Sequence, residues 1–442
     1  MLTPEIPVGT NPYGVAITPN GQLAYVSNLG PNGGGNTVSV INTATNTVVD
    51  TITVGDGPTD IAITPDGQYA YVVNSNGTSA NGRTVSVIET ATNTVVDTIV
   101  LGIPISQQPL SIAITPDGQY AYITTQNGSA TPRTVIVIAT AINTNTAIRD
   151  TIVGTPITVG IFSRDVTIAP DGQLAYVTNN GDNTVSVIDT ATNTVTDTIT
   201  VGSSPWNVAI TPNGRLAYVT NQGGNTVSVI DTATNTVVDT IAVGATPYGV
   251  AITPDGKFAY IINKADGTAS VIDTATNKVV NTIVGIGTDP AEIRITPDGK
   301  FAYINDRTDN AITVIAIGAT LTANLPGGVL NASYTGSVTA TDPASSTFTY
   351  AVTDGSLPPG VKLNTATGQL TGTPTATGSY PFTVTATAST LVRGLGETIS
   401  QQFTIVVRSA STAPIPTLSD MALVLLALLL GASAVAVKRR GY

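Results

Sequence analysis

Cysteine and histidine are both absent from the 442-residue sequence. Without cysteine there is no disulfide and no zinc-thiolate site, and without histidine there is no imidazole base, haem–histidine bond or Ser/His/Asp set. Copper-cluster and haem enzymes that need histidine ligands are excluded for the same reason. The lack of cysteine does not by itself identify a cellular compartment.

Charge is also scarce. Asp, Glu, Lys and Arg make up only 10% of the residues, with 17 basic against 28 acidic side chains and a formal net charge of −11. An acidic balance argues against a nucleic acid or an anionic lipid surface as partner. Most acids fall in repeated turns, where we expect them to be solvated. We see no acid pair outside these turns, so a paired-carboxylate mechanism is not predicted.

A sequence repeat, represented by residues 204–244, occurs seven times with substitutions between Met1 and Gly318. Self-similarity with a period of about 40–50 residues is typical of solenoids and propellers. The repeat is marked by its Pro-x-Gly turn, at Pro19, Pro65, Pro116, Pro170, Pro212, Pro254 and Pro297.

Each repeat holds four short runs of β-branched and aromatic residues and no helical pattern. In the fifth repeat these are 208–210, 217–219, 226–230 and 236–241, separated by turns such as TPNG and DTATN. Proline, Asn, Asp and Gly supply the dihedral angles that such turns need. We therefore predict four antiparallel strands per repeat, a to d.

Such a sheet is apolar on both faces and must stack against its neighbours, and a closed ring protects both ends of the stack. The sequence thus predicts an all-β fold with a seven-bladed β-propeller over residues 1–318. The seventh repeat lacks strand d, whereas Thr3–Gly9 resembles the end of strand d in the first repeat, Asp50–Gly55. We expect the N-terminal strand to complete the last blade, with Pro4 and Pro7 at a sheet edge.

Length variation falls in the b–c and d–a loops, including Gly154–Asp165, which emerge on one side of the disc, here called the loop face. Loops on a rigid scaffold commonly carry binding residues, and aromatic and Arg side chains are common at recognition surfaces. Alternatively, aromatic residues after the entry proline fill the gaps between blades. The candidate binding residues are Tyr13, Arg83, Arg133, Phe162, Arg164, Trp206, Tyr248 and Arg307, with Lys264 nearby in sequence.

The Asn that ends strand b in five repeats resembles a ring of ligands. We expect these side chains to satisfy loop backbone groups instead. They are Asn28, Asn74, Asn179, Asn221 and Asn263.

The repeats resemble the YVTN family of β-propeller repeats, which occur in surface-layer and other cell-envelope proteins. AYVTN (175–179 and 217–221), TVSVIDTATNTV (184–195 and 226–237) and ITPDG (63–67) carry the resemblance. It implies a propeller scaffold and an envelope location, but no particular reaction.

Residues 319–408 lose the repeat and become rich in Thr, Ser and Ala. The stretch 357–387 resembles Ig-like and dystroglycan-type cadherin-like domains of bacterial surface proteins, which implies a β-sandwich. Some relatives bind calcium between modules. In this region carboxylates are few, Asp342 and Asp354 among them, and they do not form a dense acidic run. Calcium is therefore an open possibility, and no other metal or cofactor is expected.

Residues 409–420 form a linker, and 421–440 combine an apolar run with a basic end, which predicts a transmembrane helix with its end in the cytoplasm. The whole resembles an IPTL-type C-terminal sorting signal, which implies recognition and cleavage by an exosortase-like membrane protease. Asp420-Met421 stand where Glu-Trp is usual. The residues that match are Ile415, Pro416, Thr417, Leu418, Ser419, Lys438, Arg439 and Arg440.

No signal peptide precedes the first repeat. A tail with this orientation needs export of everything before it. Either the start lies upstream and this chain is a fragment, or export is unusual; we expect a fragment.

We predict a non-enzymatic interaction or structural protein on the cell surface, with no catalytic residue and with an envelope protein or glycan as partner. One alternative is an adhesion protein that binds glycans, with Tyr13, Trp206 and Tyr248 as stacking platforms. The other is a lactonase-like or lyase-like propeller enzyme, which would need acids converging in the channel.

Overall fold

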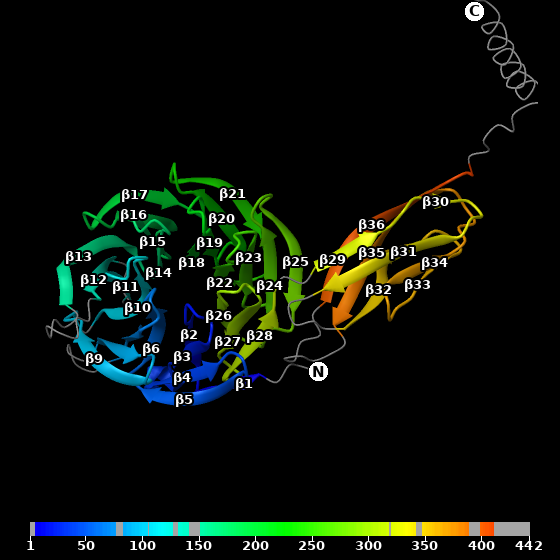
Figure 1. Ribbon diagram of the computed structural model, residues 1–442. Coiled ribbons are helices and arrows are strands. Elements are labelled where there is room, and N and C mark those ends of the chain that lie inside the picture. The colour runs from blue at the N-terminus through cyan, green and yellow to red at the C-terminus, as the bar shows by residue number, and fades with distance from the viewer. Residues whose placement is uncertain are drawn as a thin grey trace, which may run out of the picture. The chain divides into compact units, whose positions relative to one another are not determined.

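The computed structural model describes residues 5–76, 83–104, 106–126, 131–140, 151–317, 320–341, 347–388 and 398–410. Within them the strands form nine four-stranded sheets, and seven of these sheets are propeller blades arranged around a central channel (Figure 1). The other two form an Ig-like sandwich, so the fold class is all-β.

Among the described residues no helix is long and apolar enough to cross a membrane. The transmembrane helix expected at 421–440 lies outside those residues, as does most of the linker with the sorting motif.

In each blade, strand a lies innermost and strand d outermost (Figure 1). The innermost strands are β2 (Pro12–Ile17), β6 (Pro58–Ile63), β10 (Gln108–Ile114), β14 (Ser163–Ile168), β18 (Pro205–Ile210), β22 (Pro247–Ile252) and β26 (Pro290–Ile295). The second strands are β3 (Leu23–Asn28), β7 (Tyr69–Asn74), β11 (Tyr120–Gln126), β15 (Leu174–Asn179), β19 (Leu216–Asn221), β23 (Phe258–Asn263) and β27 (Phe301–Asp306). The third strands are β4 (Thr37–Asn42), β8 (Thr84–Glu89), β12 (Pro132–Ala139), β16 (Thr184–Asp189), β20 (Thr226–Asp231), β24 (Thr268–Asp273) and β28 (Ala311–Ala316).

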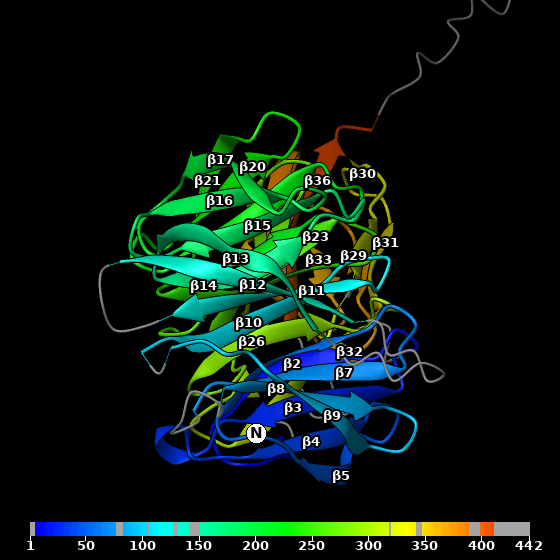
Figure 2. The same ribbon diagram turned by 90° about the vertical axis from the view of Figure 1, so that its left-hand side faces the viewer.

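The outer strands are β5 (Thr47–Thr53), β9 (Thr94–Val100), β13 (Thr151–Ile161), β17 (Thr194–Thr200), β21 (Thr236–Ala242), β25 (Lys278–Val284) and, in blade seven, β1 (Ile6–Pro7). A short 3-10 helix, η1 (Pro31–Gly33), lies in the b–c loop of blade one. Most of Gly154–Asp165 is strand rather than the enlarged loop we expected, because β13 runs on to Ile161 in pairing with β12. Figure 2 turns blade three, β10 to β13, toward the viewer.

The core lies between blades. One cluster joins Tyr176 and Val187 of blade four to Val208 and Val219 of blade five, all nearly inaccessible to solvent. Each sheet thus buries both faces against its neighbours, which is the reason that a single repeat could not be stable alone.

In at least six blades a tyrosine of strand b donates a hydrogen bond to the next blade. The hydroxyl of Tyr218 donates to Oδ1 of Asn277, at 2.8 Å, and Asn277 is the left-handed residue (φ 53°) of the next blade's c–d turn. Asn tolerates this conformation better than other non-glycine residues. The same bond closes the ring, from Tyr303 of blade seven to Asn46 of blade one at 2.7 Å.

The chain's N-terminal strand supplies the fourth strand of blade seven. β1 pairs with β28 in antiparallel register, Ile6 opposite Ile312 and Pro7 opposite Ala311. Ile6 is only 4% exposed and packs in a core cluster with residues of blades one and seven. The seam is therefore packed like the joints between consecutive blades.

The outer strands carry a bulge and a carboxylate. In β21, Val238 is an extra residue between Val237 and Asp239, which pair with Ile230 and Val229, and the Asp239 carboxylate accepts the N–H of Thr240 at 2.8 Å. The same arrangement recurs at Asp50, Asp97 and Asp197. Bulges and charges are devices that discourage pairing at a sheet edge.

The second unit is a sandwich of two sheets. One has the order β29 (Thr320–Asn324), β31 (Tyr334–Thr341), β34 (Gln369–Gly372), β33 (Val361–Leu363). The other has the order β30 (Gly328–Val329), β36 (Thr398–Arg408), β35 (Gly378–Ala388), β32 (Phe348–Gly355). Val338, Leu370, Phe382 and Ile405 are among its buried residues, as the alternation in its strands requires.

Candidate functional site

Every inner strand bulges where it enters the channel. In β18, Trp206 and Asn207 together lie opposite the single residue Thr220 of β19, between the pairs Pro205–Asn221 and Val208–Val219. The other six blades show the same two-against-one register. Bulges re-aim side chains and are common beside functional sites.

In five blades the strand-b residue opposite the bulge is polar, whereas Val73 and Ile262 occupy this position in blades two and six. Thr220 Oγ1 accepts the N–H of Asn207 at 3.0 Å and donates to the carbonyl of Tyr248, in the next blade, at 2.7 Å. Thr178 does the same between Asp165 and Trp206, at 3.1 and 2.7 Å. The backbone of both bulge residues is therefore fixed by hydrogen bonds in these blades.

Four of the first bulge residues and Arg307, which follows β27, build what we call the mouth cluster, on the loop face: Tyr13, Arg164, Trp206, Tyr248 and Arg307. The guanidinium of Arg164 lies 4.2 Å from the Trp206 ring centre, and the rings of Trp206 and Tyr248 are 4.4 Å apart. The guanidinium of Arg307 extends this row of contacts, at 4.9 Å from the ring centre of Tyr248 and 4.1 Å from that of Tyr13. Cations over aromatic rings attract one another, most strongly when desolvated.

The aromatic rings and cations of the mouth cluster already contact one another. Tyr248 is only 3% exposed, and its hydroxyl accepts a hydrogen bond from Nη2 of Arg307 at 3.1 Å. Burial raises the pKa of Tyr248 well above its ordinary value. Lys264 pairs with Asp289 at 3.0 Å beside the same ring. The rings predicted to stack on sugars thus already contact cations and one another.

The remaining predicted binding residues lie apart from this cluster. Phe162 is half-buried at positive φ, with the guanidinium of Arg133 5.4 Å from its ring centre. Arg133 and Arg83 are 0% and 4% exposed. Both arginines therefore turn their side chains into the protein, although their loops suggested a surface role.

The Asn residues that end strand b are structural, but not as we expected. Asn28 Nδ2 donates to the hydroxyls of Thr37 and Ser39, both at 3.0 Å, because strand c lies directly opposite. Hydroxyls of the same blade accept from Nδ2 of these side chains. Among the bonds of the described residues, a backbone group is bonded only at Asn179, whose Oδ1 accepts the N–H of Gly160 at 3.1 Å. The equivalent bonds recur at Asn74, Asn179, Asn221 and Asn263.

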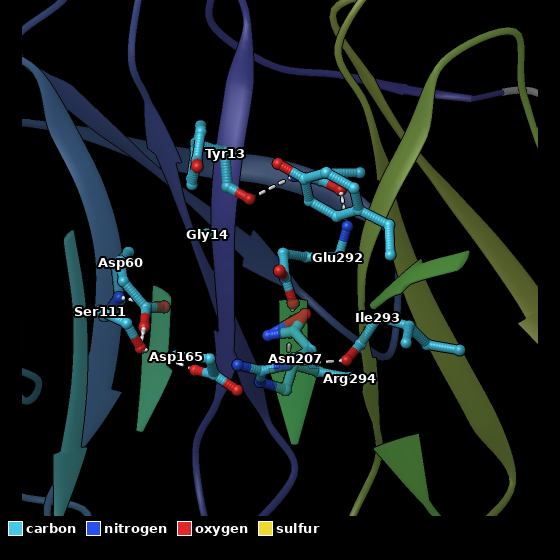
Figure 3. A network of polar contacts seen from close by, with 12 residues as sticks. Tyr13, Gly14, Asp60, Ser111, Asp165, Asn207, Glu292, Ile293 and Arg294 are labelled. Atoms are coloured by element: carbon cyan, nitrogen blue, oxygen red, sulfur yellow. Dashed lines mark hydrogen bonds and ion pairs between the residues drawn. The ribbon is translucent and has the colours of Figure 1, made fainter. Parts of the chain in front are cut away.

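The second bulge residues build a polar layer one step deeper in the channel (Figure 3). We define it as Asp60, Ser111, Asp165, Asn207 and Glu292, together with Arg294 from two residues further along β26. The two remaining positions are glycines. A Cβ on Gly14 would lie 2.5 Å from the carbonyl oxygen of Thr59, so no side chain fits there.

Ser111 links two carboxyls of this layer. Its Oγ lies 2.9 Å from Oδ2 of Asp60 and 2.8 Å from Oδ1 of Asp165. Asp60 also accepts the N–H of Ile112, and Asp165 accepts that of Val208. One hydroxyl proton cannot serve two carboxylates, so both contacts are hydrogen bonds only when one carboxyl is protonated and donates to Ser111.

The electrostatics agree with such proton sharing. Burial raises the pKa of Asp165 to about 6, and the nearby Asp60 carboxylate adds to the shift. Burial also raises the pKa of Glu292 to about 7, although its ion pair with Arg294, 3.3 Å long, opposes the shift. Carboxyls tuned to this range are common at functional sites.

The channel is narrow above this layer and wide below it. The compartment between the mouth cluster and the polar layer has a volume of about 20 Å³, enough for roughly one water molecule. Below lies a cavity of about 400 Å³ that extends to Pro19 in an a–b turn. Its wall includes a ring of small residues at one position of the inner strands, Ala16, Ala62, Ala113, Thr167, Ala209 and Ala251, completed by Arg294.

This polar layer corrects our expectation that no acid pair stands outside the repeated turns. Asp60, Asp165 and Glu292 lie within inner strands of three different blades. Each is single in its own repeat, so they converge only through the ring. Aligning the third residue of each inner strand could have shown the signal, because polar residues there interrupt an apolar strand.

Among the described residues no group of three or more Asp and Glu side chains could hold a metal ion. For the calcium considered in the sandwich, Asp354 is exposed in β32, and Asp342 lies outside the described residues.

Comparisons with known proteins support the fold in three parts. The model "Lactonase, 7-bladed beta-propeller" matches residues 111–240, 164–285 and 232–326. The model "Putative Ig domain" matches 313–408, and the IPTL-CTERM motif matches 413–440. A search of curated proteins gives no match.

Solved structures agree on the fold. Hydrazine synthase from Kuenenia stuttgartiensis is 23% identical with a TM-score of 0.59, over 72% of this chain and 97% of its own. A functionally unknown protein from Desulfotomaculum acetoxidans is 21% identical with a TM-score of 0.53, over 63% of this chain and 87% of its own. At these identities the likeness concerns fold alone. The chain is a seven-bladed β-propeller protein with an Ig-like domain and a C-terminal IPTL-CTERM sorting motif.

Proposed function

We propose that this protein is a non-enzymatic binding protein displayed on the outer side of the cell envelope. The IPTL-CTERM match at 413–440 supports surface targeting. In this proposal an exosortase-like protease recognises Ile415–Ser419 and cleaves nearby, and the apolar run within 421–440 anchors the chain until then.

The loop face is the proposed contact surface, and the observation that carries it is the mouth cluster. Residues of five successive blades, four to seven and then one, meet there through cation–ring and ring–ring contacts. Aromatic and Arg side chains held rigidly at one spot are the composition of an interaction hot spot.

A protein partner suits this cluster better than a glycan. Stacking of a sugar on Trp206 would compete with Arg164 and Tyr248, which already contact that ring. The glycan alternative would gain support if the full chain bound glycans on an array and Trp206→Ala abolished that binding.

The test of the contact surface is cross-linking of the full chain to envelope fractions. We expect Trp206→Ala and Arg307→Ala to reduce recovery of one defined partner at least tenfold. The control Val238→Ala, on the outer strand β21 at the rim of the disc, should leave recovery unchanged. Recovery of the same partner by all three variants would exclude the mouth cluster. Intact protein found only in the cytosol of fractionated cells would exclude surface display.

The polar layer favours a second candidate, an acid–base enzyme in the channel. Carboxyls with pKa values near neutrality can donate and accept protons at physiological pH. The matched propeller model is described as a lactonase. The test is hydrolysis of a sugar lactone by the full chain and by Glu292→Gln. A rate no higher than the spontaneous one would exclude this candidate.

A further inference from the structure

Two carboxyl groups of the polar layer have hydrogen-bond donors but form no ion pair, although the charge of Arg294 acts on both. Ser111 lies within hydrogen-bond distance of both Asp60 and Asp165, and each carboxyl also accepts a backbone N–H. None of the ion pairs in the described part of the chain includes either residue. Arg294, the cation of this layer, pairs with Glu292 instead.

A third side chain with an unpaired acceptor, that of Asn207, lines the same space. Asn207 is only 7% exposed, and its Oδ1 has no hydrogen-bond partner. It lines both the small compartment above and the large cavity below. A buried acceptor without a donor is costly, and a ligand that brings an N–H or O–H group removes that cost.

The space below the three acceptors has a mixed lining, in which polar groups stand beside small alkyl side chains. The wall of the 400 Å³ cavity includes the alanine ring and, further out, Ile17, Ile63 and Ile252. The cavity reaches the a–b turn at Pro19, whereas the mouth cluster narrows the channel on the other side to about 20 Å³. A ligand therefore enters from the turn side, with an aliphatic body behind a polar head.

We propose that the channel binds a small organic ammonium ion, with its N–H groups on Asp60, Asp165 and Asn207 and its aliphatic part in the alanine-lined cavity. An ammonium group has three donors and no acceptor, which suits three acceptors. A carboxylate ligand would meet two further carboxylates. A metal ion is disfavoured because the described residues contain no suitable cluster of ligands. This inference goes beyond the proposed function, since it uses the opposite end of the channel.

The charges around this head group predict how binding depends on pH. Asp60 on β6, Asp165 on β14, and Glu292 and Arg294 on β26 act on one another, with Arg307 beyond them. Because burial raises the pKa of Asp165 to about 6, its ionised form becomes dominant above that pH. A cation binds the ionised form better, so affinity rises from pH 5.5 to 7.5.

The experiment is calorimetric titration of the full chain at pH 7.5 with butylammonium, and with 1-butanol and butyrate as neutral and anionic matches. We expect butylammonium to bind at least tenfold more tightly than either. Affinity should rise up to about fourfold for each methylene from ethyl- to pentylammonium. Tetramethylammonium, which has no N–H group, should bind at least tenfold more weakly than butylammonium.

Two variants test the residues. Asp165→Asn can keep the contacts to Val208 and Ser111 but loses the charge, and it should weaken butylammonium binding at least tenfold. Asn207→Ala removes the third acceptor and should weaken it severalfold. Asp197→Asn, on the outer strand of the same blade, is the matched control and should bind as the original chain does.

Thermal melting shows whether each variant is folded, and if Asp165→Asn does not fold, Asn207→Ala decides alone. The proposal is overturned if no alkylammonium ion shows saturable binding, if butanol or butyrate binds as tightly, or if a folded Asp165→Asn or Asn207→Ala variant binds like the original. Failure of loop-face capture would leave these outcomes unaffected, so the two proposals can fail separately.

Discussion

Blades five and seven share one frame and differ in what they present to the channel. β18 (PWNVAI) and β26 (PAEIRI) have the same bulge and register. At the channel-facing positions Trp206, Asn207 and Ala209 of blade five become Ala291, Glu292 and Arg294 of blade seven. The two blades thus keep the same bulge and register with different side chains at the bulge positions.

The same two blades differ in how they are completed. Blade five takes its outer strand, β21, from the next stretch of chain, whereas blade seven takes β1 from the other end of the sequence. The packing of Ile6 and the hydrogen bond from Tyr303 to Asn46 resemble the contacts between consecutive blades. Completion of a blade thus depends on side-chain pattern rather than on chain connection.

Removal of residues 1–9 should have the largest effect on stability, because blade seven would then lack the outer strand that blade five keeps. Blade seven would lose its edge strand, the buried Ile6 and the bond between Val8 N–H and the Asn310 carbonyl. We expect a loss on the order of 5 kcal/mol in unfolding free energy. Denaturant unfolding would measure it, with Val238→Ala on the rim as a control. A midpoint equal to that of the full chain would show that β1 does not close the ring.

The polar layer should give stability an unusual pH dependence. The pKa values of Asp165 and Glu292, about 6 and about 7 in the folded chain, lie above their ordinary values. At pH values between the ordinary pKa values and these raised ones, the folded chain binds more protons than the unfolded chain does. The free energy of unfolding therefore falls as pH rises from about 4 to about 7, by up to a few kcal/mol. Unfolding midpoints across this range would measure the fall. Asp165→Asn with Glu292→Gln should flatten the curve, and an unchanged slope would refute the assignment.

Arg294→Ala gives blade seven the residue that blade five has at this position. Because the Arg294 guanidinium opposes the rise in the pKa of Glu292, its removal leaves that pKa higher. The side chain is about one-third exposed, so we expect a loss of only about 1–2 kcal/mol at pH 8 and less at pH 5. Lys257→Ala, which breaks an exposed pair with Asp255, is the control. A loss that did not depend on pH would indicate packing instead of charge.

Tyr218→Phe should have the smallest effect, since it removes one hydrogen bond between blades five and six. We expect about 1 kcal/mol, the usual cost of one such bond. Tyr120→Phe, at a partly exposed ring, should cost less. Equal thermal midpoints for Tyr218→Phe and the original chain would show that the hydroxyl contributes nothing to the joint.

The repeat predicts the blades well, because runs such as TVSVID and turns such as TPDG encode strands and left-handed positions locally. The propeller and the Ig-like domain are confirmed. The polar layer could not be read in the same way, because Asp60, Asp165 and Glu292 are isolated in their repeats and meet only across the ring. Arg83 and Arg133 show a second limit, since a long side chain on a loop can turn inward. The sequence of the third repeat differs from the others, so it indicates a loop where part of the strand β13 (Thr151–Ile161) lies.

The bulged outer strands have a consequence for a molecule held at high local density. When two copies approach side by side, Asp50, Asp97, Asp197 and Asp239 bring like charges together, and the bulges twist the strands out of register with each other. The rim is apolar in part, with Val238 and Val49 about half exposed, so without these devices crowded copies could fuse into continuous sheets. The carboxylates therefore keep crowded neighbours as separate molecules.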